Sequence, residues 1–187
     1  LRAAAATLRE IEPQGSTALY GSVVAVSYER FEARPDGRRR AVIVLTDGDD
    51  TISSVTSRTA ARAALAHDVS VYIVSIGRIA AAIYEQVSTN RAVPTEKRQE
   101  FRDALGRLRR AEERMSHLVD QTGGRILYPS GPGDLTKAYR EIAEEIRSRY
   151  LLGYYPPPDS AAGFHAISVV TRRKNVRVHA RQGYFKE

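Results

Sequence analysis

"AVIVLTDGDD", residues 41–50, is the stretch that decides how the rest of the chain is interpreted. Its first six residues, 41–46, are almost entirely apolar, which predicts a strand buried on both faces. Three aspartates and a glycine follow within four positions. Because an unpaired buried carboxylate is costly, these side chains are expected where the strand leaves the core. The stretch therefore predicts either an ordinary polar turn or a site at the end of the strand.

Further apolar runs and helix-like segments surround this strand. Residues 69–77 predict a second buried strand, and residues 125–128 predict a short third one. Helices are expected at 18–31, at 57–67, in a long region with apolar spacing over 101–118, and at 135–149. Ser16 or Thr17 is expected to cap the helix at 18–31, and Thr95 the long one. Strands that alternate with helices predict an α/β fold with a parallel sheet and crossover connections.

The pattern changes after residue 149. Residues 150–187 contain extended segments without helices between them, and "RRKN" at 172–175 is a plausible hairpin turn. We therefore divide the chain into residues 1–149, which form the α/β domain, and a β-strand tail, 150–187. This tail is expected to pack on the sheet or to extend it.

Composition excludes several classes of protein. A chain of 187 residues is long enough for one domain with a sizeable core. The absence of cysteine excludes disulfides and thiolate metal sites. No apolar run approaches the roughly 18 residues that a transmembrane helix needs. The net charge of +7 leaves nucleic acid, anionic lipid and acidic proteins open as partners.

Much of the positive charge lies on the long helix. Its arginines are a candidate basic surface for phosphates: Arg102, Arg107, Arg109, Arg110 and Arg114. Glu112 and Glu113 are interspersed among them, which favours a solvated face, and aromatic residues do not alternate with these charges. Nucleic-acid binding is therefore the less favoured interpretation.

Motifs for catalysis are missing from the sequence. The four histidines, His67, His117, His165 and His179, do not have metal-ligand spacing. There is no Gly-x-Ser-x-Gly elbow and no phosphate-binding glycine loop. We therefore expect a protein that is not an enzyme.

Two segments of the chain together resemble a known family. "GSTALYGSV" at 15–23, followed by "VIVLTDGDD" at 42–50, is similar to the second and third parts of the metal-ion-dependent adhesion site of von Willebrand factor type A domains. The tail, with "YLLGYYPPP" at 150–158 and "VRVHARQGYF" at 176–185, resembles the ending of a bacterial VWFA-related family. Members of that family are modules of larger, often exported, proteins, so the resemblance implies an extracytoplasmic or secreted location.

The resemblance implies a doubly wound (Rossmann-like), mostly parallel sheet with a metal at the carboxyl ends of its central strands. Thr17 would offer a hydroxyl and Asp47 a carboxylate, with Ser16 and Asp49 as auxiliary residues. These hard oxygen ligands suit Mg²⁺ or Mn²⁺. In the family, a carboxylate from a partner protein completes the coordination shell. The implied function is non-catalytic, metal-dependent protein recognition; the alternative is a scaffold or assembly module with a vestigial metal site.

One part of the family pattern is absent. The first motif, Asp-x-Ser-x-Ser, does not occur in these 187 residues. In the family it lies upstream, so the resemblance implies a carboxyl-terminal portion that binds metal only together with that motif. The sheet is then expected to be incomplete beside strand 41–46, with an edge open to the upstream part of the protein or to a second copy.

Overall fold

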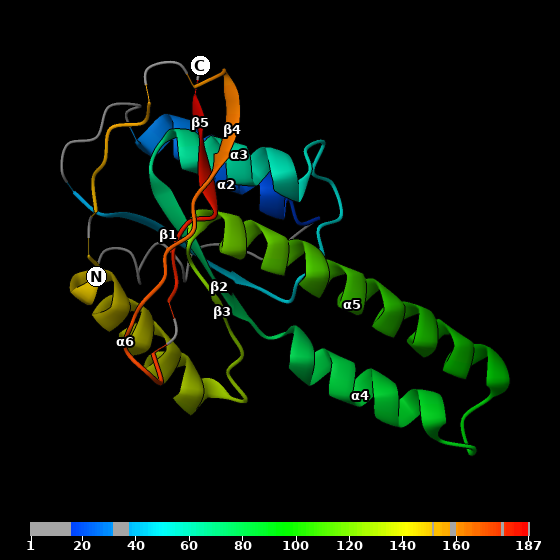
Figure 1. Cartoon of the computed structure of the whole chain (residues 1–187). Helices are drawn as coiled ribbons and strands as arrows, with labels where there is room; N and C mark the ends of the chain where they lie inside the picture. The colour runs from blue at the N-terminus through cyan, green and yellow to red at the C-terminus, as the bar shows by residue number, and fades with distance from the viewer. Residues whose placement is uncertain (1–15, 32–37, 151, 158–159, 177, 187) are drawn as a thin grey trace.

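The structure is a computed structural model that describes residues 16–31, 38–150, 152–157, 160–176 and 178–186 (Figure 1). It is a mixed α/β fold with a parallel sheet between helices. In chain order its elements are α2 (Leu19–Arg30), β1 (Arg40–Thr46), α3 (Ser57–Ala66), β2 (Val69–Ser75), α4 (Gly77–Thr89), α5 (Thr95–Thr122), β3 (Ile126–Leu127), α6 (Pro132–Ser148), β4 (Gly163–Ala166) and β5 (Gly183–Lys186). The α/β class expected from the sequence is confirmed.

The main sheet has three parallel strands in the order β1-β2-β3. β1 pairs with β2 along its whole length, and β3 pairs with the centre of β2. Helices make both crossovers, as parallel neighbours require. The carboxyl ends of β1 and β2 therefore open on the same edge of the sheet.

Helices cover the two faces of this sheet unequally. On one face, α2, α3 and α5 bury a core around Val23, Val71, Ile73 and Leu118. On the other face, α6 packs over Tyr72 and its neighbours in a smaller cluster. Figure 1 shows α6 on the side of the sheet opposite α2 and α3.

The two long strands differ in burial. Every residue of β2 except Ser70 is buried, so the expectation of a strand buried on both faces is confirmed there. For β1 that expectation is wrong within the described residues, because Ile43 is 39% exposed and Leu45 is 52% exposed. In the described part of the chain, β1 has one neighbouring strand. No element of that part covers the face of β1 on which Ile43 and Leu45 lie. β1 is therefore an edge strand of the described sheet.

Two helices lie between β2 and β3, and the second of them, α5, contains the expected helical region 101–118. α4 and α5 form a hairpin that extends away from the sheet (Figure 1), and the rings of Tyr84 and Phe101 lie 5.4 Å apart between them. The expected cap at Thr95 is wrong, because Pro94 is the N-cap residue and makes no side-chain cap bond. The Thr95 hydroxyl instead accepts a hydrogen bond from the Arg98 side chain.

The tail forms its own small sheet. β4 and β5 pair antiparallel with each other and not with β1–β3. β4 and β5 are shorter than the hairpin strands expected on either side of 172–175. They pair at the ends of the hairpin that are farthest from that turn. The Gln182 amide donates to the Gln121 carbonyl, and Arg181 forms an ion pair with Asp68. The tail thus attaches to the end of α5 and to the turn before β2 instead of extending the parallel sheet.

Within the described part of the chain, no helix is long and apolar enough to cross a bilayer.

Candidate binding site at the carboxyl edge of the sheet

Two segments that are far apart in the sequence meet at the carboxyl edge of the sheet. The loop after β1 lies against the residues that lead into α2. The Thr17 amide donates to the Thr51 hydroxyl at 2.8 Å, and the Thr51 amide donates to the Thr17 carbonyl at 2.9 Å. The two segments that carry the predicted site residues are therefore held side by side.

Asp50, the last residue of the stretch 41–50, caps helix α2. Its Oδ2 accepts a hydrogen bond from the Tyr20 amide at 3.0 Å, and Oδ1 accepts one from the Ser53 amide at 2.9 Å. The Ser53 hydroxyl accepts from the Gly21 amide at 3.0 Å. A carboxylate at a helix N-terminus satisfies free amides and favours the helix dipole. Asp50 thus has a structural role that its position in the sequence does not reveal.

This arrangement overturns the predicted cap. Ser16 and Thr17 do not cap α2: the N-cap residue is Ala18, and it makes no side-chain cap bond. The donors of the first turn are satisfied by the loop after β1, so the Ser16 and Thr17 side chains are not needed there. Both residues are exposed.

Hydrogen bonding also sets the charge of Asp50. Burial alone would raise the pKa of its carboxyl, but the hydrogen bonds from Tyr20 and Ser53 outweigh it and hold the pKa below its ordinary value. The carboxylate is therefore ionised near neutral pH and engaged with α2. Among the described residues, Asp47 accepts no such hydrogen bond from α2.

Backbone packing fixes the position of Asp47. Gly48 has φ +100°, and a Cβ there would lie 2.9 Å from Met115 Cε. A Cβ on Gly77 would lie 2.3 Å from the Asp47 carbonyl oxygen. The Asp47 side chain is exposed, and its Oδ1 accepts from the Asp49 amide at 3.3 Å. Asp47 and Asp49 are therefore both accessible from solvent.

The donor set meets the requirements for a divalent cation only in part. Thr17 and Asp47 offer a hydroxyl and a carboxylate from adjoining loops, and hard cations prefer such oxygens. Among the described residues there is no group of three or more His, Cys, Asp or Glu side chains that could hold a metal. Thr17 and Asp47 therefore do not by themselves make up a coordination shell.

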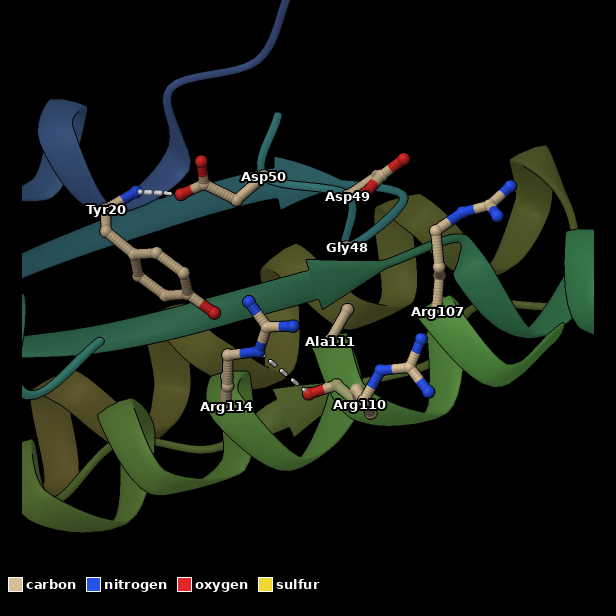
Figure 2. Close-up of a pocket in the computed structure, with 8 residues that line it drawn as sticks. All are labelled: Tyr20, Gly48, Asp49, Asp50, Arg107, Arg110, Ala111 and Arg114. Atoms are coloured by element: carbon tan, nitrogen blue, oxygen red, sulfur yellow. Dashed lines mark hydrogen bonds between the residues drawn. The ribbon is translucent and has the colours of Figure 1, made fainter. Parts of the chain in front are cut away.

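A cavity of about 260 Å³ opens beside this loop (Figure 2). One side is formed by Tyr20, Gly48, Asp49 and Asp50, and the other by Arg107, Arg110, Ala111 and Arg114 of α5. Figure 2 shows the Asp50 carboxylate turned toward the Tyr20 amide and the arginine side chains rising from the helix below. The cavity brings the loop of the predicted metal site and part of the predicted basic surface together.

The structure divides the five arginines of the basic surface. Arg107, Arg110 and Arg114 line the cavity, whereas Arg102 and Arg109 are exposed and do not line it. Arg107, Arg110 and Arg114 follow one another at steps of three and four residues, which places them on one side of the helix. Sequence reasoning found the charges but not the side of α5 that faces the Asp47–Asp50 loop.

Tyr20 is the cavity residue that sequence reasoning missed. Desolvation by burial raises the pKa of its phenol to about 12, against the opposing effect of the Arg114 charge. The hydroxyl is therefore neutral near pH 7 and can donate a hydrogen bond. The position of Tyr20, directly after "TAL" at 17–19, did not indicate that it lines a cavity.

Next along α5, Glu112 belongs to a polar clip. The Tyr128 hydroxyl donates to Glu112 Oε1 at 2.6 Å, and Arg78 Nη2 donates to the same oxygen at 3.0 Å. The bond from Tyr128, together with Arg78, lowers the pKa of the Glu112 carboxyl. The expectation that Glu112 is a solvated charge is wrong, because it joins α4, α5 and the segment after β3.

Comparison of the chain with protein-family models, with curated proteins and with solved structures gave no match.

Proposed function

We propose that the chain is a non-catalytic protein-recognition module of the von Willebrand A type. In this proposal Mg²⁺ or Mn²⁺, held at Thr17 and Asp47, binds a carboxylate of the partner protein. The observation that supports it is the contact between the Thr17 segment and the Asp47–Thr51 loop at the carboxyl edge of a parallel sheet. Ligands in open α/β sheets bind at that edge.

The chemistry of the edge agrees with such a role. Thr17 and Asp47 are exposed, so their oxygens can reach a cation, and Ser16 and Asp49 are exposed beside them. Asp50 is less available as a direct ligand, because its oxygens accept hydrogen bonds from the Tyr20 amide at the start of α2 and from the Ser53 amide in its own loop. A bound cation would supply an electrophilic position for an incoming carboxylate.

The proposal needs more ligands than Thr17 and Asp47 provide. By the resemblance, these come from an upstream Asp-x-Ser-x-Ser motif. The test is a calorimetric titration of Mg²⁺ and Mn²⁺ into the chain and into a longer form that includes that motif. The longer form should bind one ion, and Asp47→Asn and Thr17→Ala should each weaken binding at least tenfold. The matched control is Asp120→Asn, an exposed aspartate of α5, which should leave binding unchanged. If neither form binds metal, the proposal fails.

The alternative, an assembly module with a vestigial metal site, is favoured by the edge at β1. Parallel sheets are normally covered on both faces, yet Ile43 and Leu45 are exposed, and within the described residues β1 pairs with another strand on one side only. In this alternative the occupant is a strand from the upstream part of the same protein. Light scattering tests it: the chain should self-associate and the longer form should be monomeric. Two monomeric forms, or two forms that self-associate equally, would count against the upstream strand.

A further inference from the structure

Three arginines of α5 face the Asp47–Asp50 loop without an acidic partner among the described residues. Arg78, Arg125 and Arg181 each form an ion pair within the chain. In the described part of the chain no such pair involves the arginines of the cavity, which are Arg107, Arg110 and Arg114. The one hydrogen bond given by their guanidinium groups to the described residues runs from Arg114 Nε to the Arg110 carbonyl at 3.3 Å. Most of their donors are available to a ligand.

The acidic residues of the cavity do not neutralise this charge. Asp50 is already held by the Tyr20 and Ser53 amides, and its carboxylate is turned toward α2. Asp49 is exposed, and no ion pair joins it to an arginine among the described residues. Three guanidinium groups therefore face two carboxylates, one of which is engaged elsewhere. The remaining positive charge attracts an anion, and three guanidinium groups spread along one side of α5 can each contact a separate carboxylate of one segment.

We propose that this cavity binds side-chain carboxylates of an acidic protein segment, with Arg107, Arg110 and Arg114 as the cationic contacts and the Tyr20 hydroxyl as a neutral donor. The inference rests on the proposed function for the identity of the partner, because the cavity adjoins the loop of Asp47. Its chemistry is independent of metal. An arginine fork matches the planar carboxylate and can donate two parallel hydrogen bonds to it.

The spacing of the arginines suits a segment with several acidic residues. Arg107 and Arg114 are seven residues apart, so their backbones are separated by about 10 Å along the helix. In an extended peptide, side chains on one face repeat about every 7 Å. Two or three acidic side chains of one segment can therefore reach the cavity together. One partner carboxylate on the cation proposed at Thr17 and Asp47, with others at the arginines, would make a two-part contact.

Hexaglutamate with a fluorescent label is the probe for this site. Its binding to the chain is measured by fluorescence anisotropy in EDTA and again in Mg²⁺. We expect binding in both conditions. Arg110→Gln with Arg114→Gln should weaken it about tenfold, since each exposed charge pair contributes a factor of a few. The matched control is Arg102→Gln with Arg109→Gln, which removes the same charge from the same helix outside the cavity and should weaken binding less than twofold.

Three results would overturn the proposal. They are no binding of hexaglutamate, an equal loss of binding in both double variants, and displacement of the peptide by inorganic phosphate at the same concentration. The second would reveal unspecific attraction to a basic helix, and the third a phosphate site. Binding that persists in EDTA while the metal titration of the longer form fails would support the arginine site and count against the metal site alone. Circular dichroism of each variant confirms that the helices are intact.

Discussion

β1 and β2 are similar in sequence and pair in register from Arg40 and Val69 to Thr46 and Ser75, yet they lie in different environments. β2 has a strand on each side and helices on both faces. β1 has a strand on one side, and two of its large apolar side chains are exposed. An apolar run in the sequence indicates that a strand is to be buried. It does not show which part of the molecule buries it.

The largest expected effect comes from truncating one large apolar side chain in each of the two strands. Ile73 is fully buried, so Ile73→Ala should lower the free energy of unfolding by about 2–5 kcal/mol through lost contacts and a cavity. Leu45→Ala should cost less than about 1 kcal/mol, because Leu45 already contacts solvent. Urea denaturation of both variants measures the difference. Equal losses would mean that Leu45 is covered in solution and that the comparison is wrong.

The second effect probes the point where the two strand ends meet. Gly77→Ala would place a Cβ against the Asp47 carbonyl oxygen, so we expect a loss of about 1–3 kcal/mol as the backbone shifts. Gly133→Ala is the control, since nothing lies within 4 Å of a Cβ there and alanine favours a helix. Thermal unfolding should show a lower Tm for the first variant and an unchanged or higher Tm for the second. A neutral Gly77→Ala would contradict the close approach.

The third effect separates the aspartates that follow β1. Asp50→Ala should destabilise the chain by about 0.5–2 kcal/mol, because it removes the cap of α2. Asp47→Asn should leave the free energy of unfolding within about 0.5 kcal/mol, since the side chain is exposed. Denaturant titrations of the two variants suffice. Equal destabilisation would mean that Asp47 also has a structural role.

The smallest effect is a dependence on pH at the β3 side of the sheet. The pKa of Glu112 is lowered in the folded chain, so the clip with Tyr128 stabilises above the ordinary carboxyl pKa near 4 and loses this contribution as pH falls through the lowered value. Because Glu112 and Arg78 are partly exposed, we expect less than about 1 kcal/mol. Glu112→Gln should lower stability at pH 7 and have a smaller effect at pH 3. The same deficit at both pH values would show that the charge is not involved.

The sequence predicted the helices and strands better than the contacts between distant segments. The periodicities of the apolar residues located β1, β2, α2, α3, α5 and α6, because each period follows from local geometry. The Asp-Gly turn after β1 and the segment at Thr17 were recognised as neighbours through a resemblance, and the structure holds them together. What escaped was set by contacts between distant segments. Asp50 caps a helix 30 residues away, and Arg107, Arg110 and Arg114 face a loop that precedes them by about sixty residues.

Paramagnetic broadening by Mn²⁺ in amide NMR spectra of the longer form, which includes the upstream Asp-x-Ser-x-Ser motif, tests the central claim most directly, because it detects even weak binding. If Thr17 and Asp47 form part of a metal site, signals of residues 16–18 and 47–51 should broaden first. Excess Mg²⁺ should reverse the broadening, and Asp47→Asn should abolish it. Broadening that begins at acidic positions elsewhere on the chain, or none at any Mn²⁺ concentration, would contradict a metal-dependent recognition site at this edge.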